Sequence, residues 1–174
     1  MHSETELLAL DTDDEAAVRA IVSEFANTWN RHDMQAMHEL NTEDVEWINV
    51  SGHHWRGNAA VYTGHDAIHR TIFAKTDMSI QDTAIRAIAP GVAIAVATMT
   101  FGPVIIPSGE ERSELKTRGS FILVKHDGTW KIAHFHNTSV DPEVERHDPV
   151  TWDASLTTEQ IQAILTAQRS ETSQ

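Results

Sequence analysis

The sequence predicts an α+β domain in which helices come first and an antiparallel sheet follows. Three helical patterns lie in the first half of the chain, and four strand candidates then follow one another without an intervening helix. Turn residues separate most of these strands, and strands joined by short turns pair in an antiparallel way. Two of the strands are apolar on both faces, which indicates a sheet covered on both sides.

The composition is typical of one globular domain and narrows the chemistry. The chain has 174 residues, no cysteine and a formal net charge of −13. We expect a loose segment at 1–13, a domain at 14–139 and a C-terminal extension with one helix at 140–174. Disulfides, thiolate nucleophiles and cysteine-based metal sites are excluded. The negative charge disfavours nucleic acid and anionic membranes as partners. No long apolar run or signal sequence is visible, so a cytoplasmic protein is expected.

Two helices open the predicted domain. The first starts near Asp14 and has an apolar stripe at helical spacing, formed by Val18, Ile21, Val22, Phe25 and Trp29. The second runs from Asp33 to Leu40, and the Asp33 carboxylate is expected to cap its first amides.

A short strand and a third helix come next. Residues 44–50 alternate, so that Val45, Trp47 and Asn49 share one face. The third helical stripe contains Val61, His65, Ile68 and Ile72. This helix begins either at Gly57-Asn58 or at Gly64, because glycine weakens a helix interior.

The remaining elements are the four consecutive strands and a final helix. The strand candidates are 80–88, 92–101, 116–125 and 129–138. Residues 140–155 are predicted to be a loop. Thr157 and Gln160 resemble a capping box for a last helix, whose narrow apolar stripe contains Ile161, Ile164 and Leu165.

The last strand carries two imidazoles among large apolar side chains. In a regular strand one face would hold Trp130, Ile132, His134 and His136. Histidine has a pKa of about 6.5, so it suits proton transfer, ligand hydrogen bonding or metal ligation near neutral pH. The alternative is a pair of structural histidines whose hydrogen bonds are satisfied.

Three stretches of the sequence resemble one protein superfamily. Residues 25–33 contain a Trp-Asn pair before an aspartate, residues 43–57 form a strand and loop, and residues 127–138 form the last strand. In this order they are similar to the nuclear transport factor 2-like superfamily, and to its SgcJ/EcaC branch. That branch is related to SnoaL-like polyketide cyclases and ketosteroid isomerases.

The resemblance implies a cone-shaped α+β barrel whose curved sheet and helices enclose one pocket for a small, mostly apolar molecule. The superfamily contains isomerases, cyclases, epoxide hydrolases, dehydratases and binding domains, so it leaves the reaction open. The sole tyrosine, Tyr62, lies beside the helical stripe and does not fit a ketosteroid isomerase site. An epoxide hydrolase relay of Asp82, Arg86 and Arg118 is the weaker interpretation. No nucleotide-binding motif is present, so no cofactor is predicted.

The predicted site combines imidazoles with ligand-contacting side chains. The proposed catalytic residues are His65, His134 and His136. The proposed ligand-binding residues are Asn49, Trp55, Trp47, Asn137 and Arg118. Of the adjacent pair His136 and Asn137 only one can point into the pocket, and His136 is predicted to do so. Arg118 needs an acidic partner, most simply at a homodimer interface that covers the second face of the sheet.

A zinc site is the alternative use of the histidines. His53-His54 and the i,i+4 pair His65 and His69 have suitable spacing, but the helix lacks the accompanying glutamate. We therefore predict a metal-free site and a solvated His69.

Two functions follow from these predictions. In the first, His136 or His65 is a general base, while Asn49 and the other imidazole hold a developing oxyanion during isomerisation, cyclisation or hydration. In the second, the same pocket only binds its ligand, or the domain serves dimerisation.

Overall fold

The computed structural model describes residues 9–105, 109–146, 148–151 and 155–171. The chain divides into two compact units, one ending at Ser139 and one beginning at Val140, and each is described by itself. Most of the segment predicted to be loose, 1–8, lies outside the described residues.

Three helices belong to the first unit: α1 (Thr12–Asn30), α2 (Met34–Glu39) and α3 (Asn58–His69). The predicted cap of α2 is confirmed, because the Asp33 carboxylate accepts a 3.0 Å hydrogen bond from the Ala36 amide. Helix α3 begins at Asn58 and runs through Gly64, which confirms the earlier of its two predicted starts.

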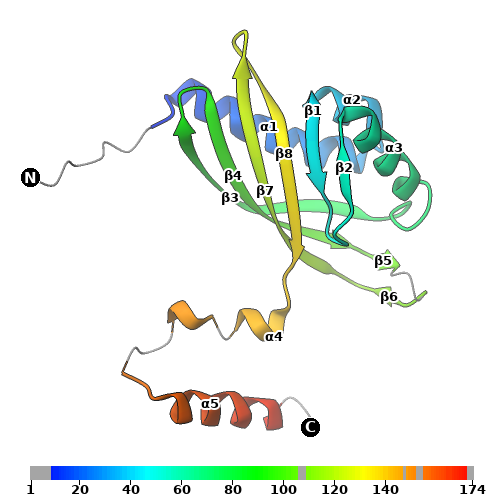
Figure 1. Cartoon of the computed structure of the whole chain (residues 1–174). Helices are drawn as coiled ribbons and strands as arrows, with labels where there is room; N and C mark the ends of the chain where they lie inside the picture. The colour runs from blue at the N-terminus through cyan, green and yellow to red at the C-terminus, as the bar shows by residue number, and fades with distance from the viewer. Residues whose placement is uncertain (1–8, 106–108, 147, 152–154, 172–174) are drawn as a thin grey trace, which may run out of the picture. The chain divides into compact units, whose positions relative to one another are not determined.

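A six-stranded sheet packs against these helices in the strand order β2-β1-β8-β7-β4-β3 (Figure 1). The strands are β1 (Asn41–Ile48), β2 (His54–Arg56), β3 (Asp77–Ala89), β4 (Val92–Gly102), β7 (Leu115–His126) and β8 (Thr129–Ser139). The predicted α+β class, with a curved and mostly antiparallel sheet, is confirmed. The sheet is open, since β2 and β3 are its edges, so the expected barrel is not closed. A separate two-stranded sheet joins β5 (Val104–Ile105) and β6 (Glu111–Arg112).

One pairing was not predicted from the sequence: β1 runs parallel to β8. Trp47 therefore lies beside Phe135, and the two rings stack with their centroids 4.2 Å apart. This pair joins β1 to β8 on the inner face of the sheet. The inner face is the one toward the helices.

The core lies between α1 and the inner face. Alternate residues of β4 are buried there: Ala93, Ala95, Ala97, Met99 and Phe101. Phe25 of α1 contacts the rings of Trp47, Phe121 and Phe135 at centroid distances of 5.6 to 5.8 Å. The apolar stripe predicted for α1 thus packs on the sheet.

The Trp-Asn pair at the end of α1 has a structural role. The Trp29 indole donates to the Thr76 carbonyl at 2.9 Å. The side-chain Nδ2 of Asn30 donates to the Met78 backbone carbonyl at 2.9 Å, and its Oδ1 accepts from the Met78 backbone N–H at 2.7 Å. Asn30 thereby fixes the end of α1 to the start of β3.

The second unit contains α4 (Pro142–Glu145), a 3-10 turn (Pro149–Thr151) and α5 (Thr158–Glu171). The segment predicted as a loop therefore holds short helical turns. The predicted capping box is confirmed, because the Gln160 side chain accepts from the Thr157 amide at 2.8 Å and the Thr157 hydroxyl accepts from the Gln160 amide at 3.3 Å. The Leu165 side chain lies outside the described residues. No helix in the described ranges is long and apolar enough to cross a membrane.

Candidate functional site

A cavity of about 310 Å³ lies in the first unit, between the helices and the inner face of the sheet. Aromatic side chains form much of its wall: Phe25, Trp29, Trp47, Trp55, Phe73, Phe101 and Phe135. Its polar side chains are Asn49, Ser51, His53, His65, Thr117 and Asn137. None of the lining residues is Asp, Glu, Lys or Arg, so the cavity wall carries no formal charge when its histidines are neutral.

Trp55 reaches the cavity because Gly64 has no side chain. A Cβ at position 64 would lie 2.6 Å from two atoms of the Trp55 indole. The glycine that weakens α3 therefore makes room for a ring from β2. Trp55 is thus one of the residues that line the cavity.

His65 is the predicted catalytic residue that the structure brings to the cavity. It is 4% exposed, and its Nδ1 lies 3.0 Å from the Val61 carbonyl. A carbonyl can only accept, so Nδ1 carries the proton and Nε2 holds the lone pair. Burial lowers the pKa of His65 to about 4, so the imidazole is neutral at pH 7.

A β-bulge in the last strand reverses the predicted orientation of its two histidines. On β7, Leu123 pairs with Ile132 of β8, whereas the residue before it, Ile122, pairs with His134. Ala133 is therefore an extra residue in β8, and beyond it the alternation of faces is inverted. Phe135 and Asn137 consequently line the cavity, and the exposed His136 does not.

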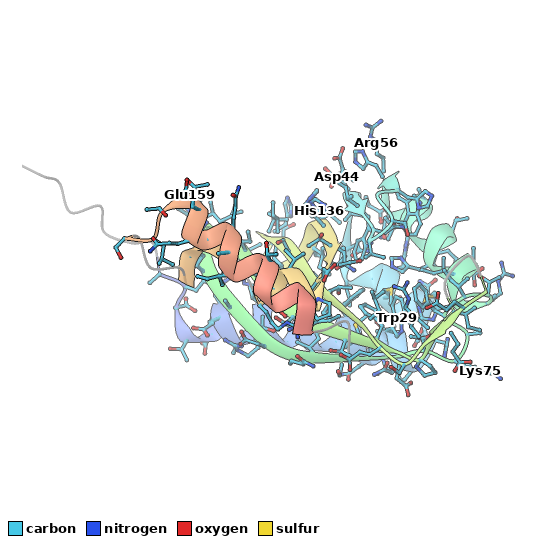
Figure 2. The ribbon with its side chains drawn as sticks, turned by 90° about the horizontal axis from the view of Figure 1, so that it is seen from below. Trp29, Asp44, Arg56, Lys75, His136 and Glu159 are labelled. Carbon is cyan, nitrogen blue, oxygen red and sulfur yellow. The ribbon has the colours of Figure 1, made fainter. Side chains whose placement is uncertain are left out.

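The prediction that His136 points into the pocket is thus wrong, and His134 is not a lining residue either. Figure 2 draws His136 well apart from Trp29, which lines the cavity. On the outer face His134 pairs in register with Glu46, whose carboxylate lies 3.1 Å from His54 Nε2. The pKa of His134 is lowered mainly by its partial burial and also by the neighbouring His136.

Asn49 lines the cavity but is committed to the turn that follows β1. Its Oδ1 accepts from the amides of Ser51 and His53, both at 3.0 Å. These bonds hold the turn at the cavity rim. The predicted role of Asn49 as an oxyanion donor would use only its Nδ2, which lies 3.3 Å from His53 Nδ1.

Among the lining residues, Asn137 and Thr117 each have a buried side-chain oxygen that is not hydrogen-bonded. Asn137 Oδ1 and Thr117 Oγ1 have no partner among the described residues. Asn137 was among the predicted ligand-binding residues, although His136 was predicted to point into the pocket in its place. Thr117 was missed because a single threonine in an apolar strand carries no distinct signal.

Arg118 lies on the outer face, where it pairs in register with Thr138. It is exposed and is not a lining residue, so the structure separates it from the predicted site.

His69 is buried, contrary to the prediction of a solvated side chain. It is 6% exposed, and its ring packs edge-on against Trp29 at a centroid distance of 4.2 Å. Its Nδ1 lies 2.9 Å from His32 Nδ1, and burial lowers the pKa of His69 to about 4. Within the described ranges no three His, Asp or Glu side chains are arranged to hold a metal ion.

Comparison with known proteins agrees with this architecture. The model of the SnoaL-like domain family matches residues 18–142. A crystal structure of an uncharacterized protein with a cystatin-like fold from Caulobacter vibrioides is similar at 31% identity, with a TM-score of 0.76 over 79% of this chain and 97% of that chain. None of the curated proteins compared with this chain matches it.

Two more distant structures share the fold. A hexachlorocyclohexane dehydrochlorinase is 10% identical, with a TM-score of 0.67 over 74% of this chain and 86% of that chain. A candidate scytalone dehydratase from Novosphingobium aromaticivorans is 17% identical, with a TM-score of 0.63 over 74% of this chain and 85% of that chain. The family match covers more than half of the sequence, and it does not single out the predicted SgcJ/EcaC branch. The chain therefore belongs to the SnoaL-like domain family of the nuclear transport factor 2-like superfamily.

Proposed function

We propose that this protein binds a small, uncharged ring molecule in its cavity and removes a proton from it through His65. The observation that carries the binding proposal is the combination of aromatic walls with the lack of any charged side chain among the lining residues. A charged ligand would lose its hydration there without gaining a counter-charge, which costs several kcal/mol. A neutral ring instead buries its surface against the aromatic side chains.

His65 is the proton acceptor in this proposal. Its Nδ1 donates to the Val61 carbonyl, which fixes the tautomer and leaves the Nε2 lone pair for a ligand. Because the pKa of His65 is lowered to about 4, the acceptor form dominates across neutral pH. Proton removal next to a leaving group or a carbonyl would give an elimination or an isomerisation. The fold shared with a dehydrochlorinase and a candidate dehydratase supports elimination.

The second candidate is a protein that binds the same molecule and releases it unchanged. The observation in its favour is that no carboxylate lines the cavity to stabilise a protonated His65. An imidazole with a pKa of about 4 is also a weak base. Both candidates require the same uncharged ligand.

A pair of probes tests the shared claim. 2-Naphthol and 2-naphthoate have similar rings, but only the second is charged at pH 7. Trp29, Trp47 and Trp55 line the cavity, so ligand entry should change tryptophan fluorescence, and calorimetry gives the affinity independently. We expect 2-naphthol to bind at least tenfold more tightly. Equal binding of the two, or none, would contradict the proposal.

Variants separate catalysis from binding once a substrate has been found by screening neutral ring compounds. His65→Gln should abolish turnover while keeping ligand affinity within a few-fold. His136→Gln makes the same chemical change on the outer face and should leave turnover unchanged. Turnover that survives His65→Gln would contradict the assignment of His65 as the proton acceptor.

We also propose that a second copy of the chain covers the outer face of the sheet. Ile94, Val96 and Ile122 are half-buried on that face although no helix of the first unit covers it (Figure 1). Their apolar surface supports a homodimer. Sedimentation analysis should give a dimer, and Val96→Glu should shift it to a monomer; a wild-type monomer would contradict the proposal.

A further inference from the structure

Two of the residues that line the cavity carry a buried polar side-chain atom with no partner among the described residues. Thr117 is 0% exposed, and its Oγ1 makes no hydrogen bond with any described residue. Asn137 Oδ1 is likewise buried and unpartnered. Native proteins pair nearly all such atoms, so each unpaired one needs an explanation.

Strand pairing brings these two side chains together. Asn137 lies opposite Gly119, and Thr117 is two residues from Gly119 on the same face of β7. Diagonal neighbours of this kind have Cα atoms about 7 to 8 Å apart, with their side chains closer. Both residues line the same cavity, so one ligand group can contact both side chains.

Glycine at position 119 is required by the packing around it. A Cβ there would lie 2.6 Å from Met99 Cε and 2.8 Å from Phe135 Cε2. The Phe135 ring occupies this space and forms part of the cavity wall. An aromatic surface thus adjoins the two unpartnered polar atoms.

We propose that Thr117 and Asn137 form a subsite for the hydroxyl group of a neutral ring alcohol or phenol. The ligand hydroxyl donates its proton to Asn137 Oδ1, and its oxygen accepts from the Thr117 hydroxyl. A hydroxyl group meets both needs because it donates and accepts at one oxygen. A ring without a polar substituent leaves both protein atoms unpaired, and an anionic oxygen cannot donate to Oδ1. This inference rests on the proposed uncharged ligand and names its chemical class.

The experiment compares 2-naphthol with 2-methylnaphthalene, in which a methyl group replaces the hydroxyl. Calorimetry is run on the full chain, on Thr117→Val, which keeps the shape of the side chain, and on Thr138→Val, a matched change on the outer face of the neighbouring strand. Removing one neutral hydrogen bond weakens binding about three- to tenfold. We expect Thr117→Val to lose that much affinity for 2-naphthol and none for 2-methylnaphthalene. Thr138→Val should change neither.

Three results would overturn the subsite, and they are distinguishable. If both ligands bind the wild-type protein and Thr117→Val weakens them equally, Thr117 only shapes the cavity. If Thr117→Val leaves 2-naphthol affinity unchanged, the hydroxyl is held elsewhere; in both cases the proposed function survives. If neither ligand binds the wild-type protein, the proposed function fails and the subsite fails with it.

Discussion

Replacing Thr117 by valine should stabilise the ligand-free protein. The Thr117 hydroxyl is buried and has no hydrogen-bond partner in the described part of the chain, so the folded state bears the cost of removing it from water. That cost is about 1–3 kcal/mol, and valine replaces the hydroxyl by a methyl group of similar size without opening a cavity. We expect a gain of roughly 1–2 kcal/mol in the free energy of unfolding. In a chain of this size that gain raises the Tm by about 2 to 8 °C.

Thr28 provides the matched control, because it is also 0% exposed but its hydroxyl donates to the Phe25 carbonyl at 2.9 Å. Thr28→Val removes a made hydrogen bond and should lower the free energy of unfolding by about 1 kcal/mol. The assay is urea unfolding followed by circular dichroism at pH 7, with a thermal scan as a second measure. Equal shifts in the two variants would refute the claim that Thr117 is unpaired.

Three further predictions concern the same cavity. The folded-state pKa of His65 is about 4 and its ordinary value is 6.5, so the unfolded chain binds more protons between these values. As the pH drops through this range, His65 should contribute roughly 3 kcal/mol to the fall in the free energy of unfolding. In urea unfolding measured against pH, His65→Gln should remove that contribution. Gly64→Ala should weaken 2-naphthol binding more than tenfold by calorimetry, because the new Cβ displaces Trp55 from its place in the cavity wall. The clash also lowers the free energy of unfolding, and the better helix propensity of alanine offsets up to about 1 kcal/mol of that loss. Unchanged affinity would contradict the packing of Gly64 against Trp55. Gly119→Ala should lower the free energy of unfolding by about 1–3 kcal/mol through its contact with Phe135, and a neutral effect in urea would be inconsistent with that contact.

The fold could be predicted because most elements carry local signals. The stripe of α1, the Asp33 cap and the hairpin strands depend on residues close together in the sequence, and each was found within a few positions. The parallel pairing of β1 with β8 could not be predicted in this way. It joins segments some 90 residues apart, and no short-range pattern specifies it.

The candidate site was predicted less completely than the fold. One extra residue in β8 explains why His136 was predicted to face the cavity and Asn137 was not. A strict alternation from Trp130 puts His136 on the inner face, and the bulge at Ala133 puts Asn137 there instead. A bulge at a small residue leaves almost no trace in the sequence. His65 was found because an imidazole in a helical apolar stripe is an unusual pattern. Thr117 was missed because its significance lies in a missing hydrogen bond, which only the structure reveals.

A crystal structure of the full chain with 2-naphthol tests the central claim most directly. We expect the rings inside the cavity against Trp55 and Phe135, with the hydroxyl oxygen within about 3.2 Å of both Thr117 Oγ1 and Asn137 Oδ1. A ligand bound on the outer face beside His134 and His136, or an empty cavity in crystals grown at saturating 2-naphthol, would contradict it.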